Sequence, residues 1–258
     1  TPPFHKKCFT IFTHEGCTWR DRTGGCKFCT LSLKAYFPNP RNIWREIQEI
    51  VQNYGQQIFF KDYGDSLTGN WDYVKQLVEA RPSSLKPFQD YAFEVYLGTR
   101  ELREDWQADL LKSLGVLRAY VGYENFSDRM LRSMRKGAAV KTHWRATELL
   151  ISRGIYNLAG CVLGCEGENE ESLKENFDGF KQLKEFCGDK LLLIAASPLA
   201  VLPGSPIFEQ LLTVEPRHGL TDDVDFIATR RDWLKHFVKL GTPEEAEKRL
   251  IQESLELG

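Results

Sequence analysis

The chain has 258 residues, and its 34 lysine and arginine side chains nearly balance 36 aspartate and glutamate side chains, for a formal net charge of −2. Apolar residues make up 42% of the chain and charged residues 27%, which is ordinary for a soluble globular protein and excludes a disordered or collagen-like chain. The longest apolar run, residues 191–196, is too short to cross a bilayer, and the near-neutral charge gives no basic footprint for a nucleic acid.

Short runs rich in aromatic and aliphatic residues alternate with amphipathic stretches along most of the chain. The runs predict strands over residues 7–13, 57–62, 91–97, 116–122, 156–163 and 191–196. The amphipathic stretches predict helices over residues 41–54, 71–80, 104–114, 127–135, 142–153 and 169–186, most of them bounded by glycine or proline. Further helices are predicted after Gly204, including residues 224–240 and 244–257.

This β-α order, repeated about six times, predicts a parallel sheet. We expect an α/β fold, an incomplete (β/α)6 barrel of parallel strands with C-terminal helices; an open doubly wound sheet is the alternative. The whole chain, 1–258, is expected to be a single domain, with β/α repeats over about 7–212 and a helical extension over 213–258. In either architecture, ligands bind beyond the C-terminal ends of the strands.

Seven cysteines are the first chemical signal. An odd number, with no visible secretory signal, argues against a disulfide scaffold and favours a reduced, cytoplasmic compartment, where clustered cysteines usually bind metal. Cys17, Cys26 and Cys29 cluster in a long segment, residues 14–39, whose aromatic residues argue against disorder. The other four are scattered along the chain: Cys8, Cys161, Cys165 and Cys187.

Three thiolates suit two kinds of metal centre. On a four-iron cubane they leave one iron open, and with His14 they would instead close a Cys3His zinc site. Spacing alone does not decide between iron-sulfur and zinc. Three unliganded core cysteines are the third reading, although the glycines and charged residues around them do not resemble a core.

Several segments in order resemble the radical S-adenosylmethionine (SAM) superfamily. Phe28 stands directly before the last clustered cysteine, as an aromatic residue does in the family, although eight residues rather than the usual three separate the first two cysteines. The resemblance covers residues 9–212 and points to the branch of the methylthiotransferases, Elongator-type enzymes and coproporphyrinogen dehydrogenase. The matching segments are residues 59–66 (FFKDYGDS), 91–94 (YAFE), 122–128 (GYENFSD), 134–137 (MRKG), 160–171 (GCVLGCEGENEE) and 199–206 (LAVLPGSP).

The resemblance implies that the three clustered cysteines hold a [4Fe-4S] cluster and that SAM binds beside them. An acidic side chain, Asp65 or Glu94, would suit the amine of SAM, and the cationic Lys136 would suit its carboxylate. The full set of implied SAM contacts is Phe28, Gly64, Asp65, Glu94, Glu124, Lys136 and Val162. Four of these residues also have a simpler interpretation. Glu94 and Glu124 could be surface carboxylates, Lys136 a cation at the end of a helix, and Val162 a core residue.

The implied activity is reductive cleavage of SAM to a 5′-deoxyadenosyl radical, with an electron from a flavodoxin- or ferredoxin-type donor, followed by hydrogen abstraction from a substrate. A small metabolite, natural-product intermediate or peptide is the favoured substrate. An archaeosine-type tRNA-modifying enzyme is the alternative, and a zinc-stabilised nucleic-acid-binding module is the competing class. Cys165 is interpreted as a hydrogen donor or added ligand, against a buried turn residue. Candidate rim residues for the substrate are Tyr63, Tyr96, Arg100 and Tyr123.

Overall fold

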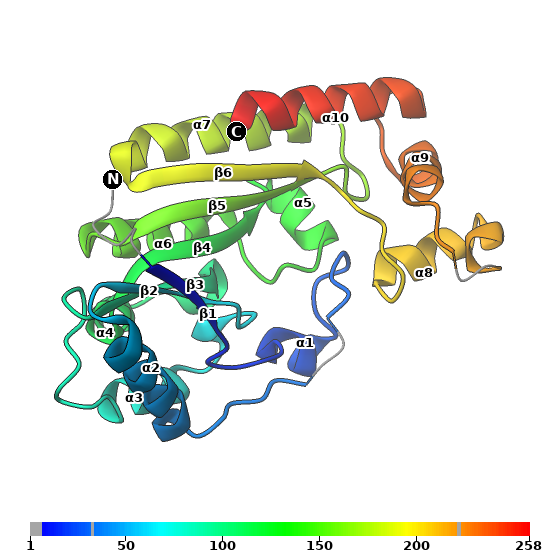
Figure 1. Cartoon of the computed structure of the whole chain (residues 1–258). Helices are drawn as coiled ribbons and strands as arrows, with labels where there is room; N and C mark the ends of the chain where they lie inside the picture. Colours follow the sequence, from blue (N-terminus) through cyan, green and yellow to red (C-terminus); the bar gives the residue numbers. More distant parts are fainter. Residues whose placement is uncertain (1–6, 32–33, 221–222) are drawn as a thin grey trace.

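The computed structural model describes residues 7–31, 34–220 and 223–258 (Figure 1). Within them, six parallel strands form one sheet in the order of the sequence, so that β1 and β6 are its two free edges. A doubly wound sheet would reverse its strand order near the middle, so the sequential order confirms the incomplete barrel. The strands are β1 (Lys7–Ile11), β2 (Ile58–Asp62), β3 (Tyr91–Gly98), β4 (Val116–Glu124), β5 (Tyr156–Leu163) and β6 (Leu191–Pro198).

Helices connect successive strands and cover the outer side of the curled sheet (Figure 1). Several begin where the sequence supplies a cap: Asn39 and Asn169 each accept a hydrogen bond from a backbone amide in the first turn of the helix that follows. The helices are α1 (Thr18–Thr23), α2 (Pro40–Tyr54), α3 (Trp71–Glu79), α4 (Asp105–Leu114), α5 (Asp128–Ser133), α6 (Val140–Ser152), α7 (Glu170–Cys187), α8 (Pro206–Leu212), α9 (Phe226–Phe237) and α10 (Pro243–Leu257).

The main core lies between the helices and the outer face of the sheet, and it runs from Ile11 to Leu257. Trp44 of α2 packs edge-on against Tyr91 and Phe93 of β3, and its indole donates a hydrogen bond to the carbonyl of Leu77 at 2.7 Å. Burying an aromatic or aliphatic side chain of this size contributes about 1.5–3 kcal/mol. The packing of the helices against the outer face therefore stabilises the fold, and the inner face of the sheet is available to line a site.

The structure corrects the sequence predictions in two places. The segment 14–39 is not irregular throughout, because it contains α1, a helix with no buried residue and hence no apolar periodicity to reveal it. The helix expected over 224–240 is shorter, Phe226–Phe237, and ends where Val238 turns to extended backbone. Over the described ranges, no helix combines the length and apolar character needed to cross a membrane.

Parallel register places three glycines side by side near the C-terminal ends of the central strands. Gly98 of β3 pairs with Gly122 of β4, which pairs with Gly160 of β5. We call these three residues the glycine row. Because a glycine carries no side chain, the row leaves space along the inner face at the level where ligands bind in folds of this kind.

Candidate functional site

A cavity of about 180 Å³ lies at the C-terminal ends of the central strands. Cys17, Cys26 and Cys29 all line it, together with Phe28. The rest of the lining comes from Leu31, from residues that follow β2, from the end of β3 and Arg100 after it, from β4, and from Lys136 after α5. The fold thus brings the three clustered cysteines to the edge of the sheet where the sequence placed the ligand site.

The first part of the cysteine segment is held by α1. Its Trp19 donates an indole hydrogen bond to the carbonyl of Arg135 at 3.1 Å, and the indole ring lies over Gly137. A Cβ on Gly137 would come within 2.3 Å of that ring, and φ is +71° there, so only glycine fits. The neighbouring Thr18 donates to the carbonyl of Gly69 at 3.1 Å. These contacts fix Cys17, which precedes α1.

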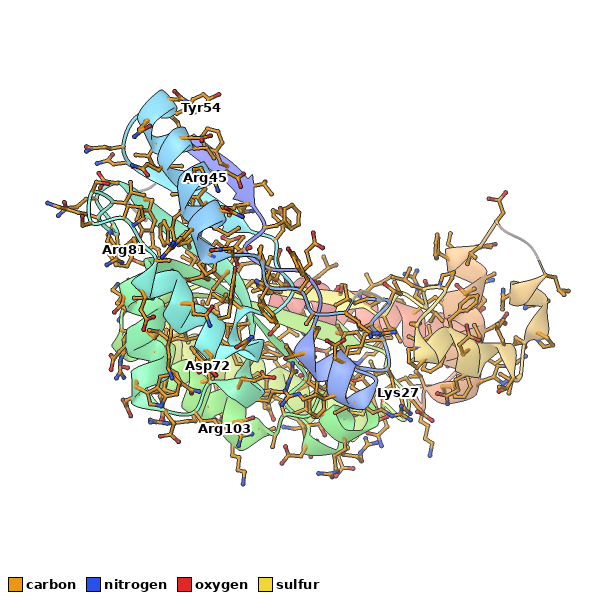
Figure 2. The ribbon with its side chains drawn as sticks, turned by 90° about the horizontal axis from the view of Figure 1, so that it is seen from below. Lys27, Arg45, Tyr54, Asp72, Arg81 and Arg103 are labelled. Atoms are coloured by element: carbon orange, nitrogen blue, oxygen red, sulfur yellow. The ribbon has the colours of Figure 1, made fainter. Side chains whose placement is uncertain are left out.

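The second part is held at Lys27, between Cys26 and Cys29. Its amide donates to the carbonyl of Met134 at the end of α5, and its own carbonyl accepts from the amide of Ile207 in α8. Its ammonium forms an ion pair with Glu166 at 2.5 Å. Figure 2 shows Lys27 beside α1. Three separate elements therefore position the Cys26–Cys29 turn.

His14 is not available as a fourth metal ligand. It is almost fully buried; its Nδ1 lies 3.0 Å from the Thr13 hydroxyl and its Nε2 accepts from the amide of Ser66 at 3.0 Å. In the part of the chain that the structure describes, no three cysteine, histidine or acidic side chains converge on one ion. A closed Cys3His zinc site needs all four side chains on one ion, so the arrangement disfavours such a site.

Lys136 and Glu124 form an ion pair over the glycine row. Their charged atoms lie 2.6 Å apart, and the side chains are only 10% and 13% exposed. Burial lowers the pKa of the Lys136 ammonium, but the Glu124 carboxylate and the Cys26 thiol outweigh it and leave the pKa above its ordinary value. A Cβ on Gly122 would lie 2.6 Å from the Glu124 carboxylate and 2.8 Å from the Lys136 ammonium. The pair therefore depends on glycine at this position.

Glu124 has an unusual backbone for a residue of its kind. Its φ is +67°, and the register between β4 and β5 shifts between Gly122 and Glu124. A non-glycine residue in the left-handed region costs of order 1 kcal/mol and is common at functional sites. The irregularity aims the carboxylate into the cavity.

Arg100, directly after β3, brings a second buried cation to the cavity. Its side chain is 7% exposed, and one guanidinium nitrogen lies 3.9 Å from the Cys17 sulfur while the other donates to the carbonyl of Lys136. The guanidinium also lies 4.9 Å from the centre of the Trp19 ring. Burial raises the pKa of the Cys26 thiol, and Lys136 and Arg100 partly offset that rise. The sequence marked Arg100 only as a rim candidate for the substrate.

Two further polar side chains line the cavity. Ser66 is buried, and its hydroxyl has no hydrogen-bond partner among the described residues. Asp65 lines it too, and its carboxylate accepts from the amide of Gly16 at 2.7 Å. Thiolates, buried cations and an unsatisfied hydroxyl around one space fit a negatively charged metal cluster and a polar ligand beside it.

Three other predicted SAM contacts lie outside the cavity lining. Glu94 is buried four residues before the end of β3, where it pairs with Arg118 at 2.8 Å and with Lys61 at 3.6 Å. Gly64 packs against the imidazole of His14, and a Cβ there would lie 2.2 Å from the ring. Val162 is partly exposed in β5 and packs against the edge of the main core.

The prediction that Tyr123 belongs to the rim is wrong. Its neighbours Gly122 and Glu124 line the cavity, so the alternation of β4 turns Tyr123 toward the helices. It is fully buried, and its hydroxyl lies 2.8 Å from that of Thr147 in α6. Tyr96 does line the cavity, and so does Tyr120. Tyr120 is two residues before Gly122 on β4, so the alternation of the strand would have predicted that it faces the same side.

The two cysteines of β5 and its following turn are packed in the core. Cys161 accepts a hydrogen bond from the side-chain amide of Asn176 at 3.4 Å, so it faces α7. Cys165 is 4% exposed and belongs to the main core, and it is not among the residues that line the cavity. Burial raises the pKa of the Cys165 thiol well above its ordinary value. This environment favours a packing role for Cys165.

Comparison with known proteins gives a family match and several similar structures. The profile of the Radical SAM superfamily matches residues 11–178. The radical SAM methyltransferase TsrM from Kitasatospora setae, solved with cobalamin and a [4Fe-4S] cluster, superposes with a TM-score of 0.67 at 16% identity, over 96% of this chain and 51% of that one. The cobalamin-dependent SAM radical enzyme OxsB gives 0.61 at 17% identity, over 82% and 36%.

Coproporphyrinogen III oxidase (HemN) from Escherichia coli, a radical SAM enzyme, gives a TM-score of 0.51 at 15% identity, over 98% of this chain and 54% of that one. No curated protein matches the sequence. The chain thus spans between about a third and a half of the length of these solved structures. At such identities the superpositions establish a shared fold.

Proposed function

The chain belongs to the radical SAM superfamily, whose enzymes use a [4Fe-4S] cluster and SAM, and from this premise we propose that Cys17, Cys26 and Cys29 hold the cluster. The observation that carries the proposal is that all three line one cavity at the C-terminal ends of the strands. The eight-residue gap after Cys17 is taken up by α1 and by the Gly24–Gly25 turn, where φ is +84° and +79°. The unusual spacing is therefore compatible with a three-cysteine cluster site.

The polar groups of the same cavity support a SAM site beside the cluster. Lys136 suits the carboxylate of SAM as a buried cation held in place by Glu124, and Asp65 suits the amine. Phe28 offers an apolar surface to the adenine. Glu94, Gly64 and Val162 lie outside the lining, so their part is to shape the walls around it. When bound, the cluster and SAM together supply the 5′-deoxyadenosyl radical.

The protein's own contribution is to bind, orient and shield the reactants. Lys136 and Arg100 lie near the cysteines and partly offset the rise that burial causes in the pKa of the Cys26 thiol. The proposed reaction is hydrogen abstraction from a small-molecule or peptide substrate, and a flavodoxin- or ferredoxin-type protein is the proposed electron donor. The overall charge of −2 does not favour a polyanionic RNA substrate.

The test is anaerobic purification followed by iron and sulfide analysis. We expect a brown protein with about four iron atoms per chain, and formation of 5′-deoxyadenosine when SAM and a reductant are added. Cys26→Ala should lose the iron, while Cys8→Ala, an exposed cysteine at the start of β1, should keep it. A colourless zinc protein, or full iron content in Cys26→Ala, would contradict the proposal.

A further inference from the structure

The inner face of the half-barrel is built in layers below the cavity. At the bottom, Phe59, Ala92 and Leu117 form a small apolar cluster of their own, separate from the main core. Above it, Glu94 is paired with Arg118 and Lys61. Among the residues that the structure describes, this layer holds two cations against one carboxylate, which leaves one positive charge in excess.

Both cations of this layer retain binding capacity. Arg118 stacks over the Phe59 ring at 4.0 Å, its side chain is 18% exposed, and its Nε has no hydrogen-bond partner among the described residues. The Lys61 side chain is 39% exposed, and its ammonium lies 3.6 Å from Glu94, beyond the length of a good hydrogen bond. A guanidinium on β4 and an accessible ammonium on β2, on either side of Glu94 in β3, are groups that can bind one carboxylate or phosphate.

An aromatic layer lies directly above. Phe12, Tyr63, Tyr96 and Tyr120 follow one another across β1 to β4, with ring centroids 6.3, 6.0 and 4.9 Å apart. We call these four residues the aromatic belt. Phe12 is 55% exposed and Tyr63 is 45% exposed. Large aromatic side chains gathered on a concave face and left open to solvent mark a binding surface.

The belt is continuous with the cavity and with an aliphatic wall. Two residues of the belt, Tyr96 and Tyr120, also line the cavity that is lined by the three clustered cysteines. In register, Tyr120 pairs with Leu158 of β5, which pairs with Leu193 of β6, an exposed residue. A molecule seated on the belt would therefore touch the space beside the proposed cluster while its lower end reached the cationic layer.

We propose that the aromatic belt and the Lys61–Arg118 layer form the substrate site, and that the substrate is a small molecule that carries a flat aromatic ring and one anionic group. This inference rests on the proposed radical SAM function, because it assigns the substrate of that same site. The ring packs on the tyrosines and the aliphatic wall, and the carboxylate or phosphate pairs with the Lys61 ammonium and the partly exposed guanidinium of Arg118. A single uncompensated charge matches one such group.

The test is anaerobic calorimetric titration of the cluster-loaded chain with four probes. These are 2-naphthoate, 2-naphthyl phosphate, 2-naphthalenemethanol, which lacks the charge, and cyclohexanecarboxylate, which lacks the aromatic ring. We expect one of the two aromatic anions to bind at least about tenfold more tightly than the last two probes. The better of the two identifies the anionic group as carboxylate or phosphate.

Variants then locate the binding. Lys61→Met should weaken the aromatic anion about tenfold and leave the neutral alcohol unchanged, while Tyr63→Ser should weaken both. Tyr54→Ser removes an equally exposed tyrosine from α2 on the outer side and should change neither. The proposal is overturned if neither aromatic anion binds to iron-replete protein, which is the result expected if an apolar segment of the same protein covers the belt. It is also overturned if Lys61→Met and Tyr63→Ser bind the probes as Tyr54→Ser does. Iron content and 5′-deoxyadenosine formation, measured on the same samples, report separately on the proposed function.

Discussion

Replacing Lys136 with methionine tests whether the ion pair over the glycine row is essential to the site. Methionine keeps the length of the side chain but leaves the Glu124 carboxylate, 13% exposed, without the ammonium that lies 2.6 Å from it. Removing one partner of a buried pair costs about 3–5 kcal/mol. Because the pair keeps some contact with solvent, we expect the lower limit, about 3 kcal/mol, which lowers the melting temperature by about 6–12 °C.

The assay is urea denaturation under anaerobic conditions, with Lys141→Met as the matched control. Lys141 lies in α6, five residues further along, and is exposed, so its replacement should change the unfolding free energy by less than about 0.5 kcal/mol. The double variant Glu124→Gln with Lys136→Met removes both charges and should recover about 2 kcal/mol of the loss. SAM affinity should still fall about tenfold in the double variant, because the cation that meets the carboxylate is gone.

Two results would refute this reasoning. If Lys136→Met is as stable as Lys141→Met, the carboxylate of Glu124 does not need its buried partner. If the double variant is no more stable than the single one, the loss comes from packing of the lysine stem rather than from an unpaired charge.

Two further predictions concern buried titratable groups behind β5. Burial raises the pKa of Glu168 from 4.5 to about 7, so the folded state holds this proton more tightly than the unfolded chain. The contribution of Glu168 to the free energy of unfolding is complete below about pH 4.5 and falls by up to about 3 kcal/mol as the pH rises through 7. Glu168→Gln should remove this loss. If the free energies of unfolding of the parent protein and of Glu168→Gln, measured by urea denaturation, change in parallel with pH, the prediction is contradicted. Cys165→Ala should keep both iron content and product formation, because the thiol is 4% exposed in the core; loss of product with retained iron would instead support a hydrogen-donor role.

Local patterns predicted the fold well for a physical reason. Each strand and helix is short, and its apolar spacing or bounding glycine is contained within the element itself, as at Gly115 after α4. The sequential order of the strands also followed, since six β-α units that neighbour one another in sequence form a curved sheet most directly. The helix α1 escaped prediction because none of its residues is buried.

The site was predictable only where a residue's position along a strand fixed its direction. Glu124 and Lys136, which the motif singled out, both line the cavity, but Tyr123, next to Glu124 on β4, faces the opposite side of the sheet. The closeness of Arg100 to Cys17 comes from the register between β3 and its neighbours together with the position of α1. No local pattern encodes such contacts, because they join parts of the chain that are far apart in sequence.

The contacts that hold Lys27 have a consequence for the order in which the site forms. The cysteine segment is synthesised before α8, yet the amide that donates a hydrogen bond to the carbonyl of Lys27 belongs to Ile207, 180 residues further along the chain. Until α8 has been synthesised and has packed against the segment, the Cys26–Cys29 turn lacks one of the three contacts that position it. We therefore expect the proposed cluster site to be fully organised only after Ile207 has been synthesised, so a chain truncated before Ile207 should be a poor recipient of iron.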